Sequence, residues 1–235
     1  MTHGPPLVSV CVPTLDEEEQ IASVLDHLAG LDDGGKLEVI VVDGGSGDAT
    51  AEIARGHPSG PRVLVRTGGR AAQLNRAAAS AAGEILVFLH ADSRLPADAL
   101  ATLSAAWSDP GLVGGNFALR FDGSDRFSRL LGAIYAAQRR LGYYYGDSTL
   151  WVRRETFAAL GGFGELPIMD DYDFVRRLER LPARTAALPG PATTSSRRWK
   201  AMGIGRTLVS WWVIRWLYVA GVPASRLARL YRPVR

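Results

Sequence analysis

The stretch Leu7-Val8-Ser9-Val10-Cys11-Val12 begins the regular structure of the chain as an apolar run rich in valine. Three further runs of the same character follow at residues 39–42, 63–65 and 85–89. Runs of this length and composition are typical of strands that are buried on both faces of a sheet. Between the first two runs, Glu17–Leu31 carries apolar residues with the spacing of one helical face. This alternation predicts an α/β fold with a mostly parallel central sheet and helices on both faces.

The second half of the chain has a more mixed pattern, which we expect to complete the same domain. The predicted single domain covers residues 1–200, with a nucleotide-binding half at about 1–95 and an acceptor half at about 96–200. A helical, basic tail follows at residues 201–235. The remaining predicted elements are helices at 49–55, 70–82, near 125–141 and at 171–180, and strands at 112–119 and 149–152.

Composition and cysteine usage indicate a globular protein from a reducing compartment. Hydrophobic residues make up 47% and charged residues 22% of the chain, which is ordinary for a folded domain. The lone Cys11 lies inside an apolar run, so we interpret it as a small buried hydrophobe. Residues 1–6 lack the basic start and long apolar stretch of a secretion signal, which predicts a cytoplasmic protein.

Basic residues gather at the end of the chain. Residues 181–235 hold ten of the 27 lysines and arginines and none of the 24 acidic residues. Because the part with recognisable chemistry is acidic, we expect no nucleic-acid partner. The apolar segment 208–222 contains three tryptophans, is too short to span a bilayer and is interrupted by Arg215. Two interpretations stay open: a helix packed on the domain, or an interfacial helix peripheral to the inner face of a membrane.

Polar residues follow three of the predicted strands. Pro13–Glu17 ends the first strand, Asp43–Asp48 the second and His90–Ser93 the fourth. In a parallel α/β sheet these ends meet at one edge, where ligands bind. Pro13–Glu17 contains no glycine, and no lysine stands where a P-loop requires one. Without a phosphate-cradling loop, a divalent cation on carboxylates has to carry the phosphates, and Mg²⁺ and Mn²⁺ prefer such oxygen ligands.

These segments and one further along form a series of four motifs in the chain: Val8–Glu17, Val42–Thr50, Phe88–Ser93, and Gly162-Phe163 with Met169–Phe174. In this order they resemble the motifs of family 2 glycosyltransferases, namely Pro-x-x-Asn-Glu, Val-Asp-Asp-Gly-Ser-x-Asp-x-Thr, the Asp-x-Asp metal motif and the Glu-Asp segment. His90 stands where the first Asp of the metal motif is common. The resemblance reaches to about Trp199. It implies a GT-A-like, Rossmann-type domain that is a metal-dependent, inverting glycosyltransferase with a UDP- or GDP-sugar donor.

The resemblance also implies a role for each segment of the donor site. Asp43 accepts a hydrogen bond from the base, Asp92 ligates the metal, and His90 contacts the metal, a sugar hydroxyl or neither. Arg70 begins a helix, where its guanidinium either reaches a phosphate with the help of the helix dipole or lies exposed to solvent. Asn75 either faces the pocket or makes a structural contact. The predicted substrate-binding residues are Pro13, Thr14, Glu17, Asp43, Gly69, Arg70, Asn75, Ala91, Asp92, Asp170, Arg198 and Trp199.

Acidic residues near position 170 are expected to serve the acceptor. On the residues alone, Asp170 is a helix N-cap with Asp173 completing the capping arrangement. The resemblance assigns Asp171 the role of general base, which takes a proton from an acceptor hydroxyl. The acceptor stays unidentified, although a lipid or another hydrophobic acceptor suits the tail. Two other functions stay open: a sugar-phosphate nucleotidyltransferase, and a catalytically silent module that binds a membrane surface.

Overall fold

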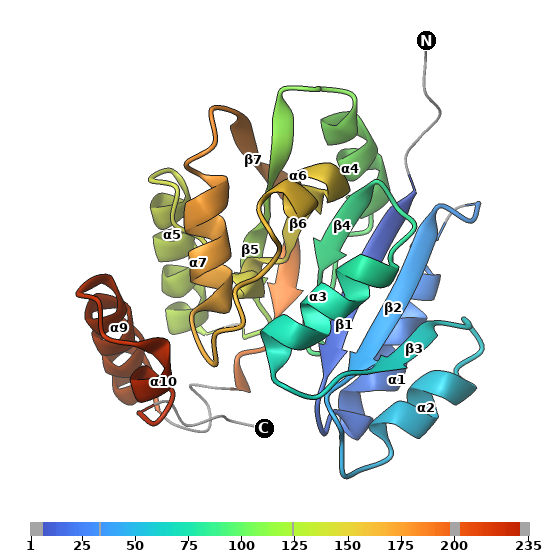
Figure 1. Ribbon diagram of the computed structural model, residues 1–235, viewed down its shortest axis with the longest axis horizontal. Helices are drawn as coiled ribbons and strands as arrows, with labels where there is room; N and C mark the ends of the chain where they lie inside the picture. Colours follow the sequence, from blue (N-terminus) through green and yellow to red (C-terminus); the bar gives the residue numbers. More distant parts are fainter. Residues whose placement is uncertain (1–6, 33, 124, 198–202, 231–235) are drawn as a thin grey trace.

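A computed structural model describes residues 7–32, 34–123, 125–197 and 203–230. Seven strands form one sheet in the order β3-β2-β1-β4-β6-β5-β7 (Figure 1). Their bounds are β1 Val8–Thr14, β2 Leu37–Asp43, β3 Arg62–Val65, β4 Ile85–Phe88, β5 Leu112–Phe121, β6 Leu150–Arg153 and β7 Arg184–Thr194. The strands run parallel except β6, which is antiparallel to β4 and β5. The predicted mostly parallel α/β sheet is therefore confirmed.

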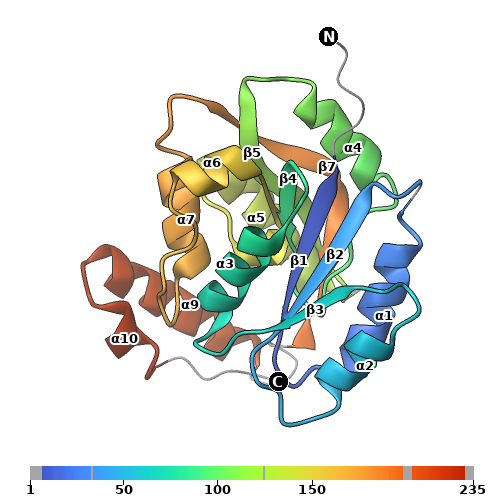
Figure 2. The ribbon, with the colours of Figure 1, turned by 45° about the vertical axis from the view of Figure 1, so that its right-hand side comes forward.

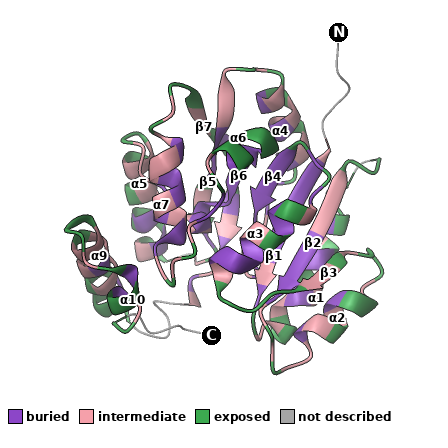
Figure 3. Ribbon diagram, viewed as in Figure 1, coloured by how far each residue is buried: buried purple, intermediate pink, exposed green. Residues whose placement is uncertain are grey.

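Helices cover both faces of the sheet. Side chains on β1 alternate between two cores, because successive residues of a strand point to opposite faces. Val10 and Val12 join the core beneath α1, α2 and α4, whereas Cys11 joins the core beneath α3, α6 and α7. Figure 3 shows the resulting layer of buried strands between half-exposed helices. The helices are α1 Glu18–Ala29, α2 Thr50–Gly56, α3 Arg70–Ser80, α4 Ala99–Trp107, α5 Arg126–Arg139, α6 Arg154–Ala159, α7 Asp170–Leu178, α9 Ile204–Val219 and α10 Ala224–Leu227, with a 3₁₀ turn η1 at Gly146–Ser148.

The reversed strand β6 decides which loops share an edge of the sheet. The other strands bring their carboxyl ends to one edge, and β6 brings its amino end there because it runs in the opposite direction. The turn η1, which leads into β6, and the first residues of α7 therefore lie near the loops after β1 and β4 (Figures 1 and 2). This arrangement places residues from both halves of the chain around one space.

The structure corrects several local predictions. Strand β7 was not predicted, because Pro189, Gly190 and Pro191 interrupt its pattern; as an edge strand it tolerates residues that cannot donate to a neighbour. Helices α4 and α6 were not predicted either. The N-cap of α7 is Met169, in the left-handed conformation with φ 66°. The sequence had predicted Asp170 as the N-cap. In the structure Asp170 is the first residue of the helix, so that prediction was wrong.

The predicted helical tail is present as α9 and α10. Ile214 and Leu227 pack against Met169 and Tyr172 at the start of α7, and the Tyr172 and Tyr218 rings meet edge to face at 5.9 Å between centroids. The opposite face of α9 is exposed, as its colouring in Figure 3 shows. Throughout the described ranges, no helix has the length and hydropathy required to cross a membrane.

Candidate active site

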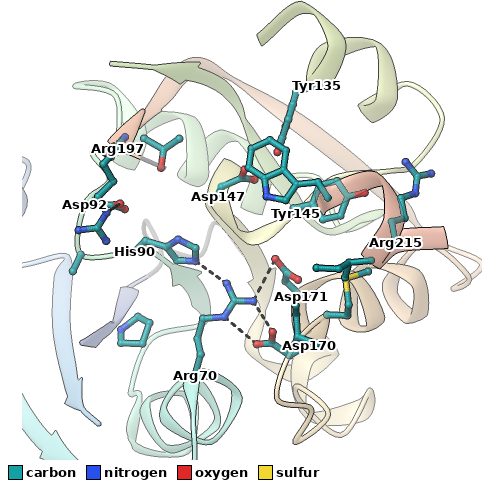
Figure 4. A pocket seen from close by; sticks show the side chains of 18 of the residues that line it. Arg70, His90, Asp92, Tyr135, Tyr145, Asp147, Asp170, Asp171, Arg197 and Arg215 are labelled. Carbon is teal, nitrogen blue, oxygen red and sulfur yellow. Dashed lines mark hydrogen bonds and ion pairs between the residues drawn. The ribbon is translucent and has the colours of Figure 1, made fainter. Parts of the chain in front are cut away.

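A cavity of about 920 Å³ opens at the edge that holds the ends of β1, β4, β5 and β7 and the start of β6. Figure 4 shows acidic and basic side chains from distant parts of the chain facing this space. Most of the predicted site residues line it: Pro13, Thr14, Glu17, Gly69, Arg70, His90, Ala91, Asp92, Asp170 and Asp171. The edge predicted from the strand ends is therefore the edge at which the cavity lies.

Arg197, directly after β7, joins two of these loops across the cavity. Its guanidinium donates to the Glu17 carboxylate at 2.9 and 3.2 Å. Its Nε lies 3.1 Å from Oδ2 of Asp92. The hydrogen bonds with Glu17, and the charge of Asp92, raise the pKa of Arg197. A fixed positive charge thus lies between the loop after β1 and the loop after β4, where an anionic ligand would meet it.

Arg70 is the centre of a second charged cluster. Its Nε donates to Oδ2 of Asp170 at 3.1 Å, and its Nη2 donates to the second oxygen of the same carboxylate. Its Nη1 lies 3.1 Å from Nε2 of His90, and Nη2 lies 3.4 Å from Oδ2 of Asp171. An arginine donor requires an unprotonated acceptor, so His90 is neutral at Nε2. Burial and the charge of Arg70 lower the pKa of His90.

The carboxylate of Asp171 is fixed by two backbone donors. The Gly146 N–H donates to Oδ2 and the Tyr172 N–H donates to Oδ1, each at 2.8 Å. Burial opposes ionisation of Asp171, but Arg70 and these two N–H groups outweigh it, and its pKa lies below the ordinary value. Asp171 is therefore an ionised hydrogen-bond acceptor at neutral pH.

Backbone strain is concentrated around the cavity. Asp16, Thr149 and Met169 adopt positive φ values of 54°, 52° and 66°. Asp16 follows β1, Thr149 leads into β6, and Met169 precedes Asp170. Side chains other than glycine rarely adopt this conformation, and such strain is typical of sites where geometry serves function.

Two of the predicted residues lie elsewhere. The Asp43 carboxylate accepts hydrogen bonds from the N–H groups of Gly45 and Ser46, each at 3.0 Å, and does not line the cavity. The Asn75 side chain exchanges two hydrogen bonds with the backbone of Phe163, at 2.8 and 2.9 Å. Asp43 thus stabilises its own loop, and Asn75 joins helix α3 to the segment that holds Phe163. A contact of either residue with substrate stays a prediction. Arg198 and Trp199 lie outside the described residues.

Several polar residues of the cavity were not predicted from the sequence, among them Arg197, Gln73, Tyr135 and Asp147. Gln73 Nε2 donates to the carbonyls of Thr14 and Val42, at 2.7 and 2.8 Å, and so joins the ends of β1 and β2. Asp147 precedes the predicted strand at 149–152, which is the end of a strand at which the rule for parallel sheets places no ligand. The direction of β6, which brings Asp147 to the site, cannot be read from its apolar pattern.

Asp92 is the carboxylate that fits a divalent cation. It lines the cavity, and the Arg197 guanidinium shows that a positive charge is accommodated beside it. Among the residues that the structure describes, no group of three or more His, Cys, Asp or Glu converges on one point. The protein would thus supply one carboxylate and leave the remaining positions to phosphate and water, an arrangement that Mg²⁺ commonly adopts. His90 directs Nε2 to Arg70, so its predicted role as a metal ligand gains no support from this geometry.

The sheet, its flanking helices and the charged cavity at this edge define a GT-A-type glycosyltransferase fold. The model of the glycosyl transferase family 2 matches residues 9–163, and the chain belongs to this family. A mannosyltransferase from Pyrobaculum calidifontis, solved with GDP-Man and Mn²⁺, is similar with a TM-score of 0.64 and 28% identity, over 81% of this chain and 56% of that one. Glucosyl-3-phosphoglycerate synthase from Mycobacterium tuberculosis, solved with Mn²⁺, UDP and glucosyl-3-phosphoglycerate, has a TM-score of 0.59 and 25% identity, over 93% and 81%.

Two curated relatives match different shares of the chain. A beta-monoglucosyldiacylglycerol synthase from Synechocystis is 28% identical over 90% of this chain and 50% of its own length. A glucosyl-3-phosphoglycerate synthase from Mycolicibacterium paratuberculosis is 38% identical over 36% of this chain and 28% of its own length. The chain thus spans half or less of the length of these curated relatives.

Proposed function

We propose that this protein transfers a sugar from a UDP- or GDP-sugar to an acceptor hydroxyl, with a divalent metal and with inversion at the anomeric carbon. The observation that carries the proposal is the convergence of Asp92 and Asp171 on one cavity from segments 79 positions apart. One carboxylate faces Arg197 and the other faces Arg70, so the two have distinct surroundings. The different surroundings fit two different roles, with Asp92 at the leaving group and Asp171 at the acceptor.

The donor lies at the side of the cavity formed by the loops after β1 and β4. Pro13, Thr14 and Glu17 border the nucleoside, and Asp92 holds Mn²⁺ or Mg²⁺. The metal supplies positive charge for the diphosphate leaving group. Arg197 adds a guanidinium at the same place, because its ion pairs with Glu17 and Asp92 can be exchanged for phosphate oxygens. The Mn²⁺ and GDP-Man named for the Pyrobaculum mannosyltransferase support this assignment.

The acceptor hydroxyl lies at Asp171. Its carboxylate takes the proton while the hydroxyl oxygen forms a bond to the anomeric carbon and the bond to the diphosphate oxygen breaks. The hydrogen bonds from Gly146 and Tyr172 hold this carboxylate in one orientation. Arg70 keeps it ionised and also binds both carboxylate oxygens of the neighbouring Asp170.

Two alternatives are less well supported. A nucleotidyltransferase normally has a glycine-rich first loop, whereas the segment after β1 is Leu15-Asp16-Glu17 and membership of the family favours transfer of sugar. A catalytically silent module would not need an ionised, doubly anchored Asp171 in the cavity.

We further propose that the exposed face of α9 rests on an anionic membrane surface. Val209, Trp212, Trp216 and Val219 recur at helical spacing and are each more than half exposed. The described part of the tail adds arginines and no acidic residue, which suits lipid phosphates. The Synechocystis relative, whose name specifies a diacylglycerol product, supports a hydrophobic acceptor for this chain too.

A panel of UDP- and GDP-sugars with Mn²⁺ tests the catalytic proposal, with release of nucleoside diphosphate as the measurement. We expect one donor to be used, and Asp171→Asn to slow turnover by about 10²–10⁴-fold while binding of the nucleotide with Mn²⁺ persists. Asp98→Asn, an exposed change outside the cavity, is the matched control. Release of diphosphate from a nucleoside triphosphate, or full activity of Asp171→Asn, would contradict the proposal.

A further inference from the structure

Whereas the donor side of the cavity is lined by charged residues, the part that lies between helices α5 and α9, called here an arm of the cavity, has apolar walls. Its walls carry Leu131 and Ile134 from α5 and Trp211 and Ile214 from α9. The cation Arg215 also lines the cavity, with its guanidinium 4.7 Å from the centre of the Tyr143 ring. An arm with such walls favours a ligand with an apolar body, since burial of apolar surface is the main attraction that it offers.

Asp147 lies at the inner end of this arm. It belongs to η1, the turn whose Gly146 N–H anchors Asp171, so the two acids are held by one segment. Tyr135 and Asp147 both line the cavity, and the Tyr135 hydroxyl and the Asp147 carboxyl influence each other's pKa. Figure 4 shows Asp147, Tyr135 and Tyr145 around the same part of the cavity, across from Arg70. Asp147 therefore faces the space into which an acceptor has to extend to reach Asp171.

The carboxyl of Asp147 has an unused hydrogen-bonding atom. Its Oδ1 is buried and has no hydrogen-bond partner in the part of the chain that the structure describes. A buried polar atom without a partner is energetically costly, so such atoms in native structures usually bind water or a ligand. Burial, and the charge of Asp171, raise the pKa of Asp147 to about 7. The group can thus offer both an O–H donor and an acceptor oxygen, which is the complement of a hydroxyl.

We propose that Asp147 and Tyr135 form the hydroxyl-binding end of an acceptor subsite that extends between α5 and α9 and takes an alcohol with an apolar body. This inference rests on the proposed function, because it specifies the acceptor for the reaction at Asp171. Asp147 binds and orients the alcohol, and Asp171 receives its proton. The apolar walls select the body of the acceptor, and Asp147 selects the hydroxyl over groups that cannot donate a hydrogen bond.

Binding of simple alcohols tests this subsite without turnover. The probes are 1-butanol, 1-hexanol and 1-octanol, with heptyl methyl ether as the partner of octanol that lacks a hydroxyl donor. Quenching of tryptophan fluorescence reports the binding, because Trp211 and Trp212 line the cavity. We expect affinity to rise about three- to fourfold for each added CH₂, and octanol to bind about fivefold more tightly than the ether.

Variants identify the residue responsible for that preference. Asp147→Ala should bind octanol and the ether equally, and Tyr135→Phe should reduce the preference without abolishing it. Asp98→Ala, on the exposed surface, should leave the preference unchanged. Asp147→Leu, which keeps the approximate shape of the side chain without a polar atom, serves if the alanine variant does not fold and should likewise bind octanol and the ether equally. Equal binding of octanol and the ether by the unaltered protein, or an unchanged preference in Asp147→Ala, would overturn the proposal.

A separate measurement distinguishes this inference from the proposed function. Titration with UDP or GDP in the presence of Mn²⁺ tests the donor side alone. If both nucleotides fail to bind while the preference for alcohols persists, the transferase assignment fails and the subsite stands. If a nucleotide binds and the preference is absent, the subsite fails and the transferase assignment stands.

Discussion

Gly146 lies close to three side chains of the cluster around Arg70. A Cβ atom at this position would lie 3.1 Å from Oδ2 of Asp171, 3.3 Å from Nη1 of Arg70 and 3.3 Å from Nε2 of His90. Gly146→Ala should therefore displace the Asp171 carboxylate and reduce sugar transfer by about 100-fold, since small errors in position are costly in catalysis. Steady-state turnover and thermal unfolding check this result together.

The control for Gly146→Ala is Gly56→Ala. A Cβ at Gly56 would meet nothing within 4 Å, so this variant should keep full activity. Equal activity of the two variants would show that the close approach at Gly146 does not constrain the catalytic group.

The acid Asp147 also predicts how stability depends on pH. Its pKa rises from 3.8 in the unfolded chain to about 7 in the folded protein, because of burial and the charge of Asp171. Between these values the unfolded chain releases the proton and the folded protein retains it, so stability falls as the pH rises from about 4 to about 7 and then levels off. The loss is about 4 kcal/mol at most, from about three pH units of 1.36 kcal/mol each.

Asp147→Asn should remove this part of the pH dependence. Denaturant unfolding at pH 4.5 and pH 8 should show a variant that gains stability relative to the parent at the higher pH. Asp98→Asn, at an exposed position, should reproduce the parent profile. A parent-like profile in Asp147→Asn would mean that the carboxyl is ionised in the folded protein at neutral pH.

At the scale of elements, Asn75 connects helix α3 to the turn that precedes α7. Its amide satisfies both the N–H and the carbonyl of Phe163. Asn75→Ala should lower the free energy of unfolding by about 2–3 kcal/mol, because two backbone groups lose their partner. Asn75→Asp, which keeps the acceptor but loses the donor, should show a smaller loss in the free energy of unfolding.

Nucleotide affinity separates the two interpretations of Asn75. A structural role leaves the dissociation constant of UDP or GDP with Mn²⁺ unchanged in the alanine variant. A substrate contact would weaken nucleotide binding with little change in stability, and calorimetry distinguishes the two outcomes.

The exposed face of α9 is predicted to bind the protein to membranes. Replacing Trp212 and Trp216 by Gln should release the protein from vesicles of phosphatidylcholine and phosphatidylglycerol in a sedimentation assay, and added salt should weaken binding of the parent. Leu141→Gln, a similarly exposed apolar residue at the end of α5, should have little effect. Binding that is unchanged in the double variant would exclude this face as the contact.

The apolar strands of the first half were predicted from the sequence, and so were β5, β6, α5 and α7 in the more mixed second half, whereas α4, α6 and β7 were not. The strands that contain Val10, Val41 and Leu86 are continuous apolar runs, so their location was clear. In β7 the prolines hide a strand that depends on its place at the edge of the sheet. Met169 as N-cap was also unpredictable, because a positive φ at methionine is imposed by packing against α9 and not by local preference.

On the scale of the whole molecule, residues at the ends of the parallel strands were predictable, and residues that reach the cavity through β6 and β7 were not. Parallel strands bring their carboxyl ends together by a general rule, so Pro13 and Asp92 could be placed on one edge without coordinates. Asp147 and Arg197 reach the same cavity because β6 is reversed and because β7 exists, and neither fact can be read from the residues near them. The missing information was topology and not chemistry.

Ligand binding should stabilise the whole fold through Asp92. A nucleotide diphosphate with Mn²⁺ at about 100 times its dissociation constant adds about 2.7 kcal/mol, which raises the unfolding temperature by about 5–10 °C for a chain of this size. Asp92→Asn should lose most of this shift and keep the unfolding temperature of the free protein. The same shift in Asp92→Asn and in the Asp98→Asn control would place the metal elsewhere.

The reversal of β6 has a consequence for how such a protein can diversify. The connection from β5 to β6, residues 122–149, leaves the sheet and re-enters it at the same edge, so it is never obliged to cross to the far side. Exchange of this connection would alter what the enzyme accepts while the loops after β1 and β4 stay intact. Under the proposed function, replacement of residues 122–149 would therefore change the acceptor that is used, while the donor site on the loops after β1 and β4 is retained.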